Sequence, residues 1–106
     1  MANLFVHKSA IHGKGLFTKV QIKKGTKMCV VADLNKYSNG ENIMTDLGSL
    51  INHSKKNANC EFFEDNDSVG FVFLKPIRDI VKGEELTINY NILPFPFKSD
   101  TTGYKQ

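Results

Sequence analysis

Short apolar runs recur from one end of the chain to the other, separated by Gly, Asn, Asp and Lys. No stretch has the apolar spacing of a long amphipathic helix, and short runs bounded by turn-forming residues are typical of β-strands. The sequence therefore predicts a mostly β domain with many turns. The expected strands are Leu4–His7, Gly15–Lys19, Lys27–Val31, Cys60–Phe63, Gly70–Leu74 and Leu86–Asn89.

Two segments do not fit this strand pattern. Residues 32–49 are rich in Asn, Ser and Gly, which favour turns, so we expect a loop or a short helix there. Near the C-terminus, Pro94 and Pro96 exclude a central strand and a regular helix. We expect a folded domain over residues 1–97 and a flexible tail over residues 98–106.

An internal repeat is visible when the chain is aligned with itself so that Leu16 falls on Leu74. Ile22, Lys24 and Gly25 then coincide with Ile80, Lys82 and Gly83. In each copy a strand leads through an Ile to a Lys-Gly turn, where glycine tolerates a backbone conformation with positive φ. The repeat predicts two related β units that pack together.

Charge and cysteine content restrict the class of protein. The 106 residues are enough for one domain, and the net charge of +3 is too small for binding nucleic acid through a basic face. The run from Glu61 to Asp67 nevertheless carries four negative charges, which would suit a basic partner. Two cysteines, Cys29 and Cys60, make neither a disulfide framework nor a four-ligand zinc site, so we expect buried, reduced thiols.

The N-terminal segment has no basic start before a long apolar core, and no window of the chain approaches 18 apolar residues. We therefore expect neither a standard secretion signal nor a membrane span. The expected location is intracellular.

The first candidate motif is Gly13-Lys14-Gly15. A Gly-x-Gly sequence lets the backbone pass close to a ligand, although the pattern is also common in turns. The chain has neither the third glycine and following helix of a dinucleotide fingerprint nor a Gly-Lys-Ser/Thr phosphate loop. Nucleotide phosphates are therefore not expected as ligands.

The second candidate motif is Asn52-His53-Ser54. An Asn side chain offers a donor and an acceptor and can hold a small ligand, but the triplet could equally form a capped turn. Adjacent His53 and Ser54 do not supply the geometry of a serine-hydrolase triad. No metal site is expected, because metal-ligand spacing is missing among His7, His12 and His53.

The third candidate motif is Gly83-Glu84-Glu85-Leu86-Thr87-Ile88-Asn89-Tyr90. It predicts a turn leading into a strand that ends on Tyr90, with Phe95 and Phe97 close behind. A Tyr hydroxyl at the mouth of an apolar pocket can orient an amine, although the segment alone would also suit a core strand.

In this order, the three motifs resemble those of the SET-domain lysine methyltransferases. The resemblance covers about residues 5–97, and the second and third motifs are specific as a pair. The chain is similar to the short viral and bacterial members, which lack flanking zinc-binding segments. The resemblance implies a SET-type β-clip of small sheets, with a C-terminal segment threaded beneath a loop in a pseudoknot-like manner.

The resemblance also implies an activity and a set of site residues. S-adenosyl-L-methionine would be the methyl donor, a protein lysine would be the acceptor, and Tyr90 would be the catalytic residue. The cofactor would be held by Lys14, Gly15, Leu16, Asn52, His53, Tyr90 and Phe95, and the substrate by Ile88, Phe97, Glu64 and Asp65.

The sequence departs from the family pattern at several positions. Ala58-Asn59 takes the place of the usual Pro-Asn, with one inserted residue, and Asn89 replaces an acidic residue that often precedes the Tyr. Tyr37 is the candidate for an upstream aromatic residue near the cofactor. Ile88 stands where the family often has a Phe or Tyr that limits methylation, so we expect di- or trimethylation.

The expected partner is a lysine-bearing protein such as a histone tail. The acidic run begins just after the second motif, so we expect it near the site, where it would attract basic peptides. The enzyme is expected as a monomer or a homodimer. Two alternatives stay open, namely a β-clip module that binds ligands without catalysis and a reader of basic or methylated peptides.

Overall fold

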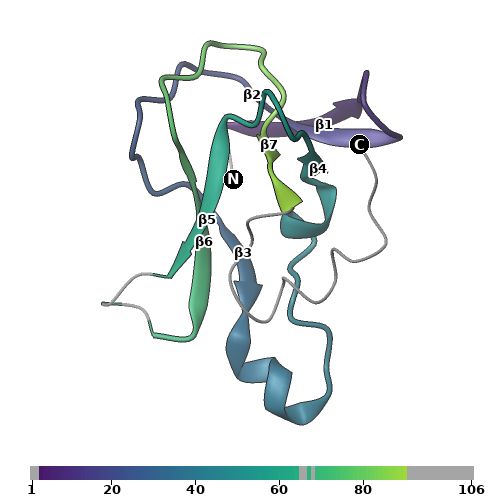
Figure 1. Cartoon of the computed structure of the whole chain (residues 1–106), viewed down its shortest axis with the longest axis vertical. Helices are drawn as coiled ribbons and strands as arrows, with labels where there is room; N and C mark the ends of the chain where they lie inside the picture. The colour runs from purple at the N-terminus through teal and green to yellow at the C-terminus, as the bar shows by residue number, and fades with distance from the viewer. Residues whose placement is uncertain (1–2, 65–66, 68, 91–106) are drawn as a thin grey trace.

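A computed structural model of the chain describes residues 3–64, 67 and 69–90. Seven strands and two short 3₁₀ helices lie within these residues, and Figure 1 shows their arrangement. In chain order they are β1 (Leu4–Lys8), β2 (Lys14–Thr18), β3 (Val30–Asp33), η1 (Leu34–Asn39), η2 (Gly48–Leu50), β4 (Asn52–His53), β5 (Cys60–Glu64), β6 (Phe71–Pro76) and β7 (Thr87–Ile88).

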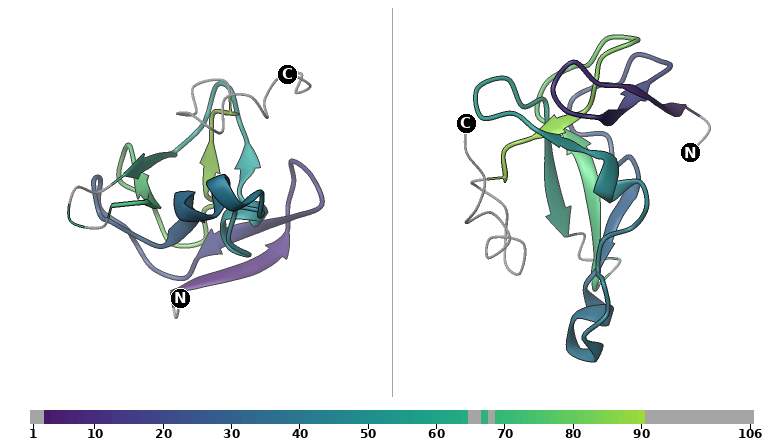
Figure 2. Two further views of the ribbon diagram at one scale, coloured as in Figure 1. Left: turned by 90° about the horizontal axis from the view of Figure 1, so that it is seen from below. Right: turned by 90° about the vertical axis from the view of Figure 1, so that its right-hand side faces the viewer.

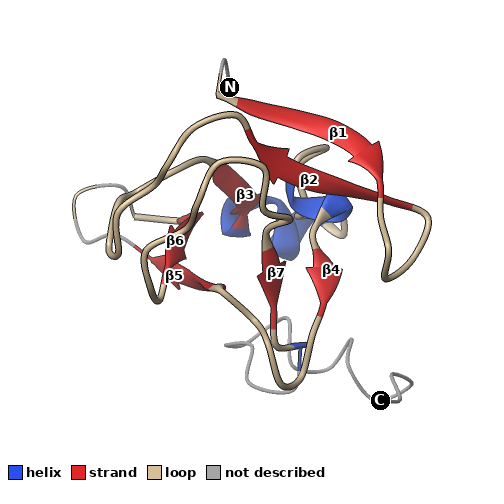
Figure 3. Ribbon diagram, turned by 90° about the horizontal axis from the view of Figure 1, so that it is seen from above, coloured by secondary structure: helices blue, strands red, loops and turns tan. Residues whose placement is uncertain are grey.

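The strands form three small sheets. β1 and β2 make an antiparallel hairpin, β6 lies between β3 and β5 in an antiparallel sheet, and β4 runs parallel to β7. Figure 3 shows β4 and β7 side by side, with β5 and β6 to one side of them. The prediction of a mostly β fold of small sheets is confirmed. The expected threading concerns residues after Tyr90, which lie outside the described residues.

Buried side chains from several strands and turns form one hydrophobic core. Along β6, Val72, Leu74 and Pro76 are buried while the two residues between them are partly exposed. Leu74 meets side chains from distant segments in this core, including the wholly buried Leu16, Ile80 and Leu86. Full burial of such a side chain contributes about 1.5–3 kcal/mol. The short strands are therefore held mainly by packing.

The sequence repeat is also a structural repeat. Ile22 and Ile80 exchange backbone hydrogen bonds of 2.9 and 2.8 Å. Two further bonds of one copy each have a counterpart in the other copy. Gly25 N–H donates to Pro76 O at 3.0 Å, and its counterpart is Gly83 N–H to Thr18 O at 2.8 Å. Met28 N–H donates to Leu74 O at 2.9 Å, and its counterpart is Leu86 N–H to Leu16 O at 2.8 Å. Each bond maps onto its counterpart when Leu16 is aligned with Leu74. The prediction of two related β units that pack together is confirmed.

The third strand and the segment after it differ in detail from the expectation. Met28 and Cys29 already bond to the backbone of Leu74, but a register shift between Val30 and Ala32 delays the regular ladder. β3 therefore begins three residues later than expected and extends to Asp33. The two 3₁₀ helices follow within the expected loop, and Figure 2 shows η1 at the end of the molecule opposite the β1–β2 hairpin.

Both cysteines are free and buried, as expected. Burial raises the pKa of the Cys29 thiol to about 11 and that of the Cys60 thiol to about 12, because a thiolate is poorly solvated in the core. In the part of the chain that the structure describes, no helix is long and apolar enough to cross a membrane.

Candidate active site

Tyr90 is the last residue that the structure describes, and it follows β7 closely. Its phenolic O–H donates a hydrogen bond of 2.5 Å to the carbonyl oxygen of Ile51. Its ring packs against that of His53, with the ring centroids 4.9 Å apart. The single hydroxyl hydrogen is used in the bond to Ile51, so the Tyr90 oxygen can form a further hydrogen bond only as an acceptor.

His53 joins Tyr90 to the mid-chain motif. β4 runs parallel to β7, with Asn52 opposite Thr87 and His53 opposite Ile88. The backbone N–H of Tyr90 donates to Nδ1 of His53 at 2.9 Å. A ring nitrogen that accepts this bond carries no proton, so the neutral imidazole has its proton on Nε2. The second and third motifs therefore form one unit.

Asn52 connects this unit to the glycine motif. Its Nδ2 lies 3.1 Å from the carbonyl oxygen of His12 and 3.3 Å from that of Lys14. The bond from Leu86 N–H to the carbonyl oxygen of Leu16 holds the glycine segment against the third motif. All three motifs, which are far apart in sequence, thus meet at one place.

The carboxylate of Glu85 lies at this meeting point. Its Oε2 accepts from Asn52 Nδ2 at 2.7 Å, and the hydroxyl of Ser9 donates to both of its oxygens at 2.8 and 2.9 Å. A Cβ built on Gly15 would overlap Oε2 and lie 2.8 Å from the carboxyl carbon. Gly15 has no positive φ. The close approach of Glu85 therefore favours a glycine at position 15, because any Cβ there would displace the carboxylate.

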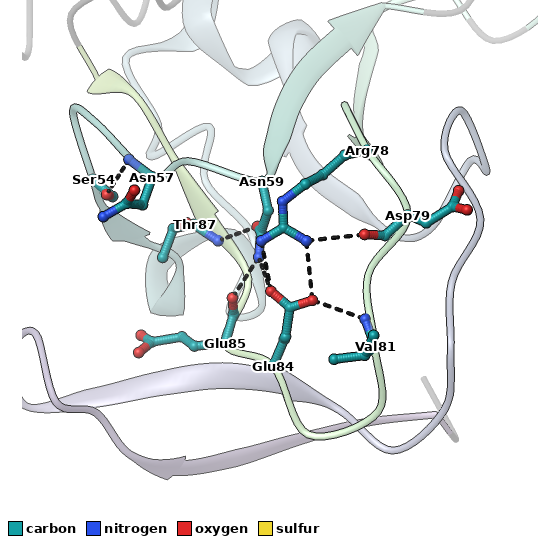
Figure 4. Close-up of polar contacts among 9 residues, drawn as sticks. All are labelled: Ser54, Asn57, Asn59, Arg78, Asp79, Val81, Glu84, Glu85 and Thr87. Atoms are coloured by element: carbon teal, nitrogen blue, oxygen red, sulfur yellow. Dashed lines mark hydrogen bonds and ion pairs between the residues drawn. The ribbon is translucent and has the colours of Figure 1, made fainter.

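Asn59 fixes β7 from another side, as Figure 4 shows. Its Oδ1 accepts from the backbone N–H of Thr87 at 2.9 Å, and its Nδ2 donates to the carbonyl oxygen of Glu85 at 2.8 Å. Its own backbone N–H donates to the carbonyl oxygen of Thr87 at 3.2 Å. The nearby Asn57 instead donates its backbone N–H to the hydroxyl of Ser54. Asn59 is thus the residue that holds the start of β7 in place.

The side chain of Glu84 points away from that of Glu85 and makes different contacts (Figure 4). Its two carboxylate oxygens pair with Arg78 at 3.0 and 2.7 Å, and one also accepts from Val81 N–H at 2.8 Å. These bonds, the Arg78 bond foremost, lower the pKa of Glu84 to about 2. Glu84 holds the turn before β7, whereas Glu85 faces the three motifs.

A family model of the SET domain matches residues 29–91, which is more than half of the chain. The chain belongs to the SET-domain family. No sequence of a curated protein matches this SET domain.

Several solved structures share its fold. They include a candidate histone methyltransferase of Plasmodium falciparum (23% identity, covering 83% of this chain and 92% of that chain, TM-score 0.59), SET8 of Cryptosporidium (21%, 86% and 58%, 0.64) and the methyltransferase domain of human PR domain-containing protein 2 (23%, 89% and 80%, 0.64). At these identities the likeness establishes the fold. The SET-type fold that the motifs implied is confirmed.

The SET domain places the predicted binding residues in different environments. The side chain of Lys14 is exposed, whereas those of Leu16 and Ile88 are buried in the core. Leu16 can therefore contribute to a binding site only through its backbone. Phe95, Phe97 and Asp65 lie outside the described residues. Among the described residues, no group of three or more His, Cys, Asp and Glu side chains could hold a metal ion.

Glu61 and Glu64 of the acidic run lie on β5. β5 begins at Cys60 beside β7 and then runs outward for about 13 Å to Glu64, at about 3.3 Å per residue. Figure 3 shows β5 and β6 to one side of β4 and β7. Tyr37 is exposed on η1, which lies at the end of the molecule opposite the β1–β2 hairpin (Figure 1). The placement of the acidic run near the site stays a prediction.

Two polar residues at the meeting point were not among those predicted from the sequence. Ser9 lies four residues before Gly13, and Glu85 lies inside the third motif. The only sequence feature that could have pointed to Glu85 was its place in a pair of adjacent carboxylates, Glu84 and Glu85, in that motif. Which of the two faces the site depends on the fold.

Proposed function

We propose that this SET domain is an S-adenosyl-L-methionine-dependent protein-lysine N-methyltransferase. The observation that carries the proposal is the convergence of the glycine motif, Asn52-His53 and Tyr90 through direct hydrogen bonds. In the family the same three motifs together serve a methyl donor and a lysine. Tyr90 would be the residue that touches the reacting amine.

The residues at the meeting point fit a donor that carries an ammonium and a sulfonium group. Asn52 directs its Nδ2 toward protein acceptors, while none of the described residues donates to its Oδ1. This oxygen would accept from the ammonium. Glu85 takes part in none of the ion pairs among the described residues, so its charge would favour a cationic ligand. When bound, the donor supplies an activated methyl group.

The acceptor lysine must lose its proton before it can attack. With a pKa of about 10.4, roughly one free lysine amine in a few thousand is neutral at pH 7. The Tyr90 hydroxyl donates its hydrogen bond to Ile51, so its oxygen would accept a hydrogen bond from an amine N–H and so direct the nitrogen lone pair. The apolar surroundings supplied by the core around Ile88 would favour the neutral amine by desolvation.

We further propose a protein with a basic segment, such as a histone tail, as the substrate. The similarity in fold to a candidate histone methyltransferase supports this choice. Ile88 offers no hydroxyl that could anchor a water molecule, so di- and trimethylated products are proposed. The protein would act inside the cell, in the cytoplasm or in a host nucleus, as a monomer or a homodimer.

The test is mass spectrometry of histone and other basic peptides after incubation with an isotope-labelled donor. The wild-type protein should add methyl groups to lysine. Tyr90→Phe should lower turnover by about 100-fold or more, with donor affinity by calorimetry nearly unchanged. Asn52→Ala should weaken donor binding by about 10- to 100-fold, because the ligand loses a buried partner. Full turnover by folded Tyr90→Phe would contradict the assignment. Donor binding without methylation of any peptide would favour a non-catalytic module.

A further inference from the structure

The side-chain amide of Asn52 has only one acceptable orientation. Its Nδ2 is surrounded by three acceptors, namely Glu85 Oε2 at 2.7 Å, His12 O at 3.1 Å and Lys14 O at 3.3 Å. A flipped amide would place Oδ1 against a carboxylate and two carbonyl oxygens, none of which can donate. Oδ1 must therefore point away from these three groups.

Glu85 provides the shortest of these contacts, and it is itself held in place. The Ser9 hydroxyl donates to both carboxylate oxygens, and Gly15 leaves the space that the carboxylate occupies. Ser9 Oγ also accepts from the backbone N–H groups of Ile11 at 2.9 Å and His12 at 3.3 Å. Ser9 thus ties the loop before the glycine motif to the carboxylate that orients Asn52.

We propose that Ser9 and Glu85 are positioning residues for the methyl donor. They lock the Asn52 amide so that its oxygen faces the ammonium of the donor, and they do so without touching the reacting atoms. This inference rests on the proposed function, and it assigns a role to two residues that the sequence motifs do not single out.

A carboxylate suits this position better than an amide, because the Ser9 hydroxyl and the Asn52 amide that contact its oxygens are both donors. Glu85→Gln would introduce an amide nitrogen facing Ser9 or Asn52. Ser9 Oγ already accepts two backbone bonds, so it is poorly placed to accept a third. The alternative is a flip of Asn52, which would turn its Nδ2 toward the ammonium of the donor. Either outcome should weaken donor binding selectively.

The kinetic test compares Glu85→Gln with Glu84→Gln in the methyltransferase assay. For Glu85→Gln we expect the KM for the donor to rise by about 10- to 100-fold, while kcat at saturating donor stays within about 3-fold. Glu84→Gln is the matched control, since the adjacent carboxylate faces Arg78 and should leave the donor KM unchanged. Ser9→Ala should raise the donor KM, and Ser9→Thr, which keeps the hydroxyl, should restore it. A purely structural role would lower the active fraction, and hence the apparent kcat, at constant KM.

A second test needs neither activity nor ligand. The Asn52 side-chain amide is identified by NMR as the signal lost in Asn52→Ala. In the wild-type protein its protons should exchange slowly with solvent, and in Glu85→Gln they should exchange several-fold faster. If wild-type protein binds the donor but folded Glu85→Gln keeps the wild-type donor KM and amide exchange, this inference is overturned and the proposed function stands. If calorimetry detects no donor binding by wild-type protein, both are overturned.

Discussion

Replacing Gly15 with Ala would test how closely the glycine motif approaches the carboxylate of Glu85. The new Cβ would overlap Oε2, lie 2.8 Å from the carboxyl carbon and lie 3.2 Å from Asn52 Nδ2. The backbone at position 15 has no positive φ, so the substitution introduces no conformational strain of its own. Any loss of stability must therefore come from displacing the neighbouring side chains.

The size of the effect follows from the bonds that the carboxylate would lose. It must move by roughly 1 Å to reach an ordinary van der Waals distance. That movement breaks the 2.7 Å bond from Asn52, and a hydrogen bond to a charged group contributes about 1.5–3 kcal/mol. Ala restricts the unfolded chain and returns about 0.4–1 kcal/mol. We expect Gly15→Ala to lower the free energy of unfolding by about 0.5–2.5 kcal/mol.

Urea unfolding of a double-mutant cycle measures this coupling. In a Glu85→Ala background the overlap with the carboxylate is gone, so Gly15→Ala should be close to neutral, giving a coupling energy of about 0.5–2.5 kcal/mol. Gly13→Ala is the control, because position 13 has a φ of 50° and open space around a Cβ. Gly13→Ala should lower the free energy of unfolding by about 1–2 kcal/mol both in the wild-type protein and in the Glu85→Ala background. The reasoning is refuted if Gly15→Ala costs the same in both backgrounds.

Three further predictions concern the network around β7 and the core. Ionised Glu84 stabilises the fold fully above pH of about 4.5, and this contribution is lost as the pH falls toward its folded pKa of about 2. Glu84→Gln should therefore lower the free energy of unfolding in urea by about 1–2 kcal/mol at pH 7 and by almost nothing at pH 2. The value at pH 7 is kept small because Arg78 is exposed to solvent. Asn59→Ala leaves a buried N–H on β7 without its acceptor and should lower the free energy of unfolding by about 2–4 kcal/mol in the same assay. Cys29 and Cys60, with pKa values of about 11 and about 12, should react with a thiol reagent at pH 8 only when urea unfolds the protein; rapid labelling of native protein would contradict their burial.

Local sequence patterns were sufficient to predict four of the strands and the repeat. The strands β1, β2, β5 and β6 lie within two residues of their expected bounds, because apolar alternation and flanking turn residues act locally. The repeat was predictable for a similar reason. Gly25 and Gly83 both adopt a positive φ, of 85° and 90°, which is what a Lys-Gly turn in each copy required.

The rest of the site depends on contacts that no local pattern encodes. β4 is only two residues long and exists only because it pairs with β7, which lies far beyond it in the sequence. Glu84 and Glu85 look equivalent in sequence, but successive residues of an extended segment point to opposite sides, and only the fold decides which side is the site. The position of the acidic run relative to Tyr90 likewise depends on the fold, because the five-residue β5 separates Cys60 from Glu64.

The reciprocal pairing of the two repeat units explains why three distant motifs meet. The bond between Leu86 and Leu16 places Glu85 beside Gly15, and the chain then continues directly into β7. Any strand that pairs with β7 is therefore brought to the glycine motif, and β4 is that strand.

The same scaffold builds only one such site, because the equivalent positions of the other copy carry different residues. In the alignment of the two copies, Gly15 corresponds to Phe73 and Glu85 corresponds to Lys27. Lys27 Nζ lies 4.5 Å from the centre of the Phe73 ring, so a cation–π contact replaces the carboxylate and its glycine. The chain then leads into β3, which pairs with β6 instead of a mid-chain strand. The contact between Lys27 and Phe73 thus lies where β3 joins the β3–β6–β5 sheet, whereas the contact between Glu85 and Gly15 orients Asn52.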